Sequence, residues 1–246
     1  MARHALTAGS VGPGIARKKV LVGSAALIAV VVAATVVALA LGSTDSSQAP
    51  PTVTGAARVA ALLNGIPQQG TTLGSPKAPV TLVEFADPQC PYCGVWARDT
   101  LPTVVTRYVR PGKVLLVFEG MAFVGPDSLT ALRTALGAGR QNRFWNVLGL
   151  LFENQGSENT GWITEPLLRS IGDAVPGLDT DRMLADRSSA AVDAEIRQAG
   201  SVARQAGVSS TPTFAVGRTG GSVRIVHVTS LTPSGLFPAL DSAAKP

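Results

Sequence analysis

The sequence predicts an α/β fold in which a block of helices separates two groups of strands. Two short apolar runs, residues 80–86 and 113–123, are rich in Val, Leu and Phe and are typical of buried strands. Residues 126–207 instead repeat apolar residues at helical spacing. Two more strand-like runs and a helix follow. The expected order within residues 71–246 is therefore βαβ, helices, ββα.

The N-terminal part of the chain contains a long segment without charge. Residues 20–41, VLVGSAALIAVVVAATVVALAL, are sufficient for a membrane-spanning helix, which needs about 20 apolar residues. Basic residues precede this segment at 17–19, and basic residues favour the cytoplasmic side. We therefore expect a cytoplasmic tail at 1–19, a single-pass transmembrane anchor in the cell membrane at 20–41, and a C-terminal domain on the extracytoplasmic side.

A signal peptide, cleaved or retained, is the alternative interpretation of this segment. The residues ALA at 38–40 fit a cleavage site, although the apolar run is longer than the roughly 7–15 residues usual for a signal peptide. Both interpretations place the remaining domain outside the cytoplasm.

The net charge of +5 comes mostly from the N-terminal tail. Of the 21 basic residues, Arg3, Arg17, Lys18 and Lys19 precede the apolar segment, whereas all 16 acidic residues follow it. The exported part is therefore close to neutral. A neutral domain lacks the basic face that nucleic acids require, so we expect no nucleic-acid partner.

Residues 42–70 are predicted to connect the anchor to the domain. The stretch 43–55, STDSSQAPPTVTG, is rich in Ser, Thr and Pro and is typical of a linker. The stretch 56–70, AARVAALLNGIPQQG, has a short apolar helical face. We expect this N-terminal extension to pack on the edge of the domain.

The folded domain should begin with a βαβ unit. The buried strand at 80–86 is followed by residues 94–109, whose apolar residues recur at helical spacing, with Pro102 as a candidate kink. The strand at 113–123 completes the unit. In the helical block that follows, Asp127 is a candidate N-cap of the first helix. The chain should end with strands at 211–217 and 222–230, joined as a hairpin, and a helix at 233–244.

Cys90 and Cys93 are the only cysteines of the chain and follow the first strand as a C-x-x-C pair. A structural disulfide across so short a loop would contribute little entropic stabilisation. A zinc site needs about four ligands, but the exported part offers only these two cysteines and His227. Copper would lack a nearby cluster of Met or His. We therefore expect no metal and no other cofactor.

A redox role for the pair has a physical mechanism. The helix expected after the motif places Cys90 near a helix N-terminus, where backbone N–H groups and the helix dipole favour a thiolate. Pro91 fits an early helical position, because its missing N–H has no partner there in any case. We expect Cys90 to be the exposed attacking thiol and Cys93, one turn later, to be the shielded thiol that resolves the mixed disulfide.

Two further features agree with redox chemistry. Glu84 stands in an otherwise apolar strand, and a buried carboxylate is costly unless it has a partner or a task. It could exchange a proton with Cys93, although a salt-bridged strand residue is the alternative. Pro212, within STPTF, precedes a strand and suggests a tight feature. The sequence is compatible with either isomer of the Thr211–Pro212 bond.

These motifs together resemble the DsbA-like thioredoxin-fold oxidoreductases of bacteria. The resemblance rests on APVTLVEFADPQCPYC, a helical block, and GVSSTPTFAVG, and it covers about residues 56–242. GPDS, FWNVLGLLFENQG and VPGLD resemble the helical insertion of the membrane-anchored branch. The resemblance implies a thioredoxin-like fold with an inserted α-helical domain, preceded by a transmembrane helix. It also implies dithiol–disulfide exchange on exported cysteine-containing proteins, with a quinone-linked membrane partner that reoxidises the enzyme.

The resemblance also assigns residues to roles. Cys90 corresponds to the nucleophilic thiol, Cys93 to the resolving thiol and Glu84 to the buried acid. Pro212 corresponds to a cis-proline that faces the thiols. Thr211 would contribute backbone groups that hold a substrate strand.

The dipeptide between the cysteines, Pro91–Tyr92, is expected to border the substrate. It departs from the Pro-His of the best-known oxidases of the family, because Tyr92 places no positive charge beside Cys90. Oxidation of substrate dithiols is the preferred hypothesis. A reductase or isomerase, and a redox-inert thioredoxin-fold binding module, are the alternatives.

Overall fold

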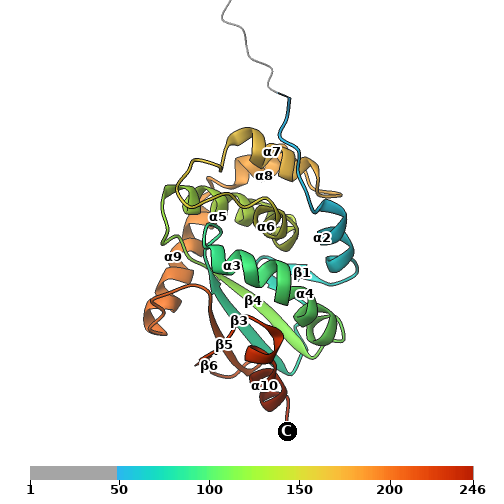
Figure 1. Ribbon diagram of the computed structural model, residues 1–246, viewed down its shortest axis with the longest axis vertical. Helices are drawn as coiled ribbons and strands as arrows, with labels where there is room; N and C mark the ends of the chain where they lie inside the picture. Colours follow the sequence, from blue (N-terminus) through green and yellow to red (C-terminus); the bar gives the residue numbers. More distant parts are fainter. Residues whose placement is uncertain (1–48, 246) are drawn as a thin grey trace, which may run out of the picture. The chain divides into compact units, whose positions relative to one another are not determined.

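The computed structural model of the protein describes residues 49–245 (Figure 1). The predicted cytoplasmic tail and the apolar segment at 20–41 lie outside this range. Within the described range, no helix combines the length and the apolar character that crossing a membrane requires.

A six-stranded sheet forms the centre of the domain, in the order β1-β2-β4-β3-β5-β6. β3 runs parallel to β4 and antiparallel to β5, so that Glu84 of β3 lies between Phe118 and Phe214 in the register. This central position follows from the sequence of β3, VTLVEFA, whose side chains are almost all buried. The strands are β1 (Gln68–Gln69), β2 (Thr72–Leu73), β3 (Val80–Ala86), β4 (Val114–Gly120), β5 (Thr213–Arg218) and β6 (Val223–Val226).

Helices cover both faces of this sheet, and Figure 1 shows α5 to α8 gathered beyond α3, at the end where β3 meets that helix. α9 packs on β4, where Ala203 joins Val83 and Phe85 in a small apolar cluster. The opposite face, with Leu82 and Phe214, belongs to the main core. The helices are α2 (Ala56–Leu63), α3 (Pro91–Val95), α4 (Leu101–Val104), α5 (Pro126–Gly139), α6 (Phe144–Glu153), α7 (Glu165–Asp173), α8 (Thr180–Asp186), α9 (Ala190–Gln205) and α10 (Pro233–Ala243). The predicted order of βαβ, helices and ββα is confirmed.

The helical stretch after the cysteine motif changes its winding twice. The π-helical turn η1 (Trp96–Thr100) lies between α3 and α4, and the π-helical turn η2 (Val105–Val109) follows α4. Pro102 stands at the start of α4, directly after η1. A proline cannot donate the usual helical hydrogen bond, and the wider turn before it accommodates this missing donor.

Several boundaries differ from the predictions. Asp127 is not the N-cap of α5: Gly125 takes that place and Pro126 begins the helix, because proline is well suited to the first helical position. β4 ends at Gly120 and β6 at Val226, so both strands are shorter than predicted. The hairpin β1–β2 was not predicted, and it pairs with β4 at the sheet edge.

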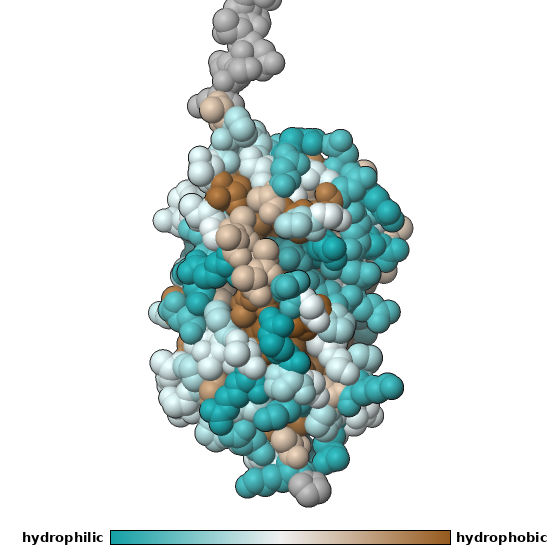
Figure 2. Space-filling model, turned by 90° about the vertical axis from the view of Figure 1, so that its right-hand side faces the viewer, coloured by the Kyte–Doolittle hydropathy of each residue, from teal (hydrophilic) through white to brown (hydrophobic). Residues whose placement is uncertain are grey.

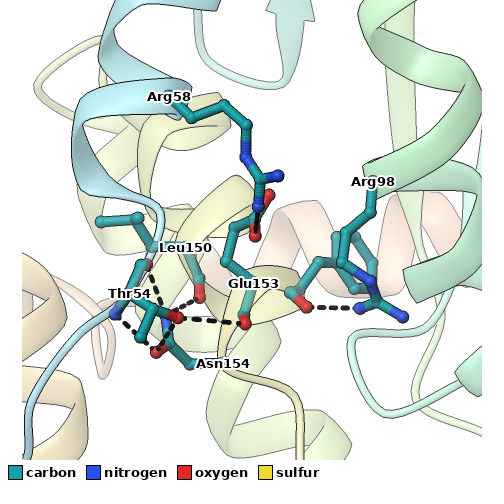
Figure 3. Close-up of polar contacts among 7 residues, drawn as sticks. Thr54, Arg58, Arg98, Leu150, Glu153 and Asn154 are labelled. Atoms are coloured by element: carbon teal, nitrogen blue, oxygen red, sulfur yellow. Dashed lines mark hydrogen bonds and ion pairs between the residues drawn. The ribbon is translucent and has the colours of Figure 1, made fainter.

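The N-terminal extension is part of the folded unit. α2 packs against α6, and Thr54 and Asn154 hold the segment before it by paired hydrogen bonds (Figure 3). Arg110 donates to the carbonyl oxygens of Leu62 and Asn64 at the end of α2. α2 is therefore fixed at both ends.

Candidate active site

The C-x-x-C motif lies where β3 ends and α3 begins. Cys90 is the N-cap of α3, with an extended backbone, and Pro91 occupies the first turn. Proline supports a helix start at this place, since its φ angle is already helical. The sequence thus positions Cys90 at the helix N-terminus, as predicted.

The Cys90 thiol is less exposed than predicted, because only 5% of the residue's surface is accessible. Its Sγ donates a hydrogen bond to the carbonyl oxygen of Thr211 over 3.3 Å. The segment of Thr211 therefore lies against the thiol and covers it. Cys90 and Thr211 are 121 positions apart in the sequence. The local pattern around the cysteine motif therefore could not predict that Thr211 covers the thiol.

The environment of Cys90 favours its thiolate. Its pKa is lowered to about 6, chiefly because the Cys93 thiol donates a hydrogen bond to it. Partial burial opposes this effect, while the Thr211 side chain and the backbone N–H groups of Tyr92 and Cys93 add to it. A thiol with this pKa is largely ionised at neutral pH and is a good leaving group.

Cys93 has the opposite character. It is completely buried, and this burial raises the pKa of its thiol well above the ordinary value. The hydrogen bond to Cys90 raises it further, because the thiol is the donor. Both cysteines are free thiols in this structure, so the geometry described is that of the reduced protein.

Glu84 lies in the core near Cys93 with 1% of its surface accessible. Burial raises the pKa of its carboxyl to about 8, and the neighbouring indole N–H of Trp96 lowers it in part. The charge of Glu84 in turn raises the pKa of Cys93. Among the described residues, no ion pair includes Glu84. Glu84 is therefore not the salt-bridged strand residue that the sequence allowed as an alternative.

The remaining predicted residues surround Cys90. The Thr211–Pro212 peptide bond is cis. Pro91 and Tyr92 are on the surface, and Tyr92 is 67% exposed. The structure thus brings the two cysteines, Thr211 and the Pro91–Tyr92 pair together, with Glu84 behind them. In the part of the chain described, no three metal-ligating side chains gather at one place.

A buried carboxylate that the sequence analysis missed fixes the loop before Cys90. Asp87 accepts hydrogen bonds from the backbone N–H groups of Gln89, Phe123 and Val124, over 2.8, 2.7 and 3.0 Å. It thereby joins the cysteine loop to the loop after β4. A polar residue directly after an apolar strand could have indicated Asp87. Its partners Phe123 and Val124, 36 and 37 positions away, could not be predicted from the sequence.

Amide side chains connect the same loop to the helical insertion. Gln155 donates to the carbonyl oxygens of Pro88 and Cys90 over 2.9 and 3.0 Å. Gln89 donates to Ser128 and accepts from the backbone N–H of Asn159. The insertion therefore supports the position of the cysteine motif.

Comparisons with known proteins agree with this geometry. A family model described as Thioredoxin matches residues 67–222. A protein of Bacillus anthracis named probable disulfide bond formation protein D is 32% identical over 148 residues, which is 59% of this chain and 68% of that protein. The disulfide bond formation protein D of Bacillus subtilis is 25% identical over 146 residues, 58% of this chain and 66% of that protein.

Solved structures show the same fold. The oxidised BdbD of Bacillus subtilis superposes with a TM-score of 0.63 at 21% identity, covering 74% of this chain and 98% of that one. The alpha-DsbA1 of Wolbachia pipientis gives a TM-score of 0.60 at 19% identity, covering 74% and 92%. The paired thiols, the fold and these relatives together show that the chain belongs to the thioredoxin family, as a DsbA-like protein-disulfide oxidoreductase.

Proposed function

We propose that the enzyme oxidises dithiols of exported proteins through a disulfide between Cys90 and Cys93. The observation that carries this proposal is the position of Cys90 at the N-terminus of α3, where the hydrogen bond from the Cys93 thiol lowers its pKa to about 6. A stabilised thiolate stabilises the reduced enzyme, and a stable reduced form makes the disulfide a stronger oxidant.

The reaction begins when a substrate thiolate attacks Cys90 Sγ of the oxidised enzyme. The bond between Cys90 and Cys93 breaks, its electron pair passes to Cys93 Sγ, and this sulfur takes a proton from Glu84. A second substrate thiolate then attacks the substrate sulfur of the mixed disulfide and releases Cys90 as a thiolate. The substrate leaves with a disulfide, and the enzyme holds the two electrons as a Cys90 thiolate and a Cys93 thiol.

The groups around Cys90 suit a substrate chain. The backbone of Thr211 would pair with an extended substrate segment by strand addition. Pro212, Pro91 and the exposed Tyr92 would border that segment. A membrane partner would return the enzyme to its oxidised form, and the apolar segment at 20–41 would anchor the domain on the extracytoplasmic side.

The reduction potential of the Cys90–Cys93 pair tests the direction of electron flow. Equilibration with glutathione buffers should give a value clearly above the about −270 mV of thioredoxin, in the direction of the about −120 mV of DsbA. A value near the lower figure would refute the oxidising direction and favour a reductase.

Trapping tests the exchange itself. A Cys93→Ala variant cannot resolve mixed disulfides, so it should accumulate covalent adducts with exported cysteine-containing proteins in cells. The double variant Cys90→Ala/Cys93→Ala is the matched control and should form none. If Cys93→Ala captured no partner while the parent protein still bound its targets, a redox-inert binding module would be the better description.

A further inference from the structure

An apolar crevice leads from the surface to Glu84. It lies between α2, the η1–α4 stretch and α6, and its enclosed space of about 40 Å³ exceeds the ~10–15 Å³ that one water molecule needs. Figure 2 views the side of the molecule on which α2 and α4 lie, and it shows apolar surface collected along the middle of that face. The walls include Val59 and Leu62 of α2, Ala97 and Leu101 opposite, and Leu148 of α6.

Glu84 gives this otherwise apolar space a polar floor. Its Oε2 atom is buried without a hydrogen-bond partner among the described residues, and the same holds for Trp96 Nε1 nearby. A carboxyl oxygen and an indole N–H are an acceptor and a donor that one water can serve together. Glu84 is among the residues that line the crevice, so water in this space can reach its carboxyl group.

Charged side chains stand at the mouth of the crevice. Arg58 of α2 makes an ion pair with Glu153 at the end of α6, as Figure 3 shows. From the opposite side, Arg98 donates to the carbonyl oxygen of Phe152 over 2.5 Å. Besides Glu84, the charged residues that line the crevice are Arg58, Arg98 and Glu153. The neighbouring elements η1, β4 and β5 also carry Asp99, Glu119 and Arg218, which are not part of its lining.

We propose that this crevice is the route by which Glu84 exchanges its proton with solvent, and that α2 is the lid that limits how much water enters. The proposal rests on the role of Glu84 in the proposed oxidation. When Cys93 takes a proton from the Glu84 carboxyl, the carboxylate that remains must regain a proton. The face toward the substrate is closed by Cys93 and by the segment that covers Cys90. A proton from solvent instead reaches Glu84 through the crevice, on the side away from the substrate, and does not pass the reacting sulfurs.

Val59 and Ala97 allow the width of the crevice to be changed in both directions without altering charge. Val59→Ala in α2 enlarges the space, and more water around the carboxylate should lower the pKa of Glu84 from its value of about 8. Ala97→Leu in η1 fills the space and should raise that pKa. Ala61→Leu, on the exposed side of α2, adds the same volume outside the crevice and should leave it unchanged.

The measurement uses the full chain in detergent. Redox-difference infrared spectra across a pH series follow the carboxyl band of Glu84, which Glu84→Gln identifies by its disappearance. We expect opposite shifts for Val59→Ala and Ala97→Leu, with proton uptake by Glu84 after reduction slowed several-fold in Ala97→Leu. Arg58→Gln/Glu153→Gln removes the ion pair that holds the lid, and should shift the pKa of Glu84 in the same direction as Val59→Ala.

An unchanged pKa of Glu84 in both Val59→Ala and Ala97→Leu would overturn the proposal. Should Val59→Ala fail to fold, Ala97→Leu against Ala61→Leu still decides it. The outcome is separate from the direction of catalysis. An unmoved pKa with an oxidising potential refutes only the proton route, and a pKa that shifts as expected with a reducing potential refutes only the proposed oxidation.

Discussion

The side-chain amide of Gln155 donates a hydrogen bond to the carbonyl oxygen of Cys90 across 65 positions of sequence. Gly94, one turn into the helical stretch, permits this approach, because a Cβ atom there would lie 2.1 Å from the Gln155 side-chain oxygen. The helical insertion thus holds the reactive segment directly, through an amide that also binds the carbonyl oxygen of Pro88.

Gln155→Leu should loosen the cysteine loop. It removes two hydrogen bonds and leaves two carbonyl oxygens without this partner, at a cost of about 1–3 kcal/mol in the free energy of unfolding. Urea titration measures this loss, and faster alkylation of Cys90 in the folded protein should accompany it. Gln205→Leu, at an exposed site of α9, is the control and should change stability by less than about 0.5 kcal/mol. Equal effects of the two substitutions would contradict a supporting role for Gln155.

Cys93→Ala should raise the pKa of Cys90 from about 6 toward the value of an ordinary thiol. The hydrogen bond from Cys93 is the largest cause of the lowered pKa, and alanine cannot donate one. Thiolate absorbance, or the rate of alkylation as a function of pH, gives the midpoint. Cys93→Ser keeps a donor at this place and should retain much of the shift. If the midpoint stayed near 6 in Cys93→Ala, the helix N-terminus and Thr211 would account for the thiolate without Cys93.

Glu84→Gln should change how stability depends on pH. The pKa of Glu84 in the folded protein, about 8, exceeds its ordinary value of 4.5, so ionisation costs more in the folded than in the unfolded state. The parent protein therefore has its full stability below pH 4.5 and loses part of it as the pH rises to about 8. Glutamine has no such loss and should stabilise the protein near pH 8 by up to about 5 kcal/mol.

Unfolding titrations of parent and Glu84→Gln at both ends of this pH range measure the difference. Glu158→Gln, at an exposed carboxylate, is the control and should follow the parent. Parallel pH profiles for the parent and Glu84→Gln would show that Glu84 ionises as easily in the fold as in water.

Tyr92→His should make the enzyme a stronger oxidant. Tyr92 is 67% exposed, so the substitution costs little packing, and a protonated imidazole beside Cys90 would stabilise the thiolate. We expect the pKa of Cys90 to fall and the reduction potential to rise by tens of millivolts, both measured in glutathione buffers. Tyr92→Phe keeps the ring without charge and should leave the potential near that of the parent. A histidine variant that matched Tyr92→Phe would show that charge at this position does not set the potential.

The sequence predicted those parts of the site that local pattern controls. An apolar strand, a C-x-x-C pair and a proline at a helix start lie within about a dozen neighbouring positions, so β3, Cys90 and α3 could be placed without further information. Glu84 was recognisable because a carboxylate is out of place in an apolar strand. The order of the strands and helices followed from the change in apolar spacing along the chain.

Contacts between distant segments could not be predicted in this way. The partners of Asp87 and Gln155, and the cover that Thr211 provides over Cys90, depend on how the insertion and the last strands return to the motif. The prediction of an exposed Cys90 was wrong for this reason. The prediction of Asp127 as the N-cap was wrong for a different reason, because the helix begins at Pro126, two residues earlier than predicted.

The hydrogen bond from Cys90 to Thr211 spans 121 positions, and this has a consequence for the order of events during synthesis. The cysteine motif leaves the ribosome long before the segment that covers it, and contacts of such long range form late in folding. The nascent chain therefore passes through a stage in which Cys90 is made but uncovered. A thiol in that stage lacks the hydrogen bond from the Thr211 side chain that helps to lower its pKa, so the reactivity of Cys90 matures only when the last strands have docked.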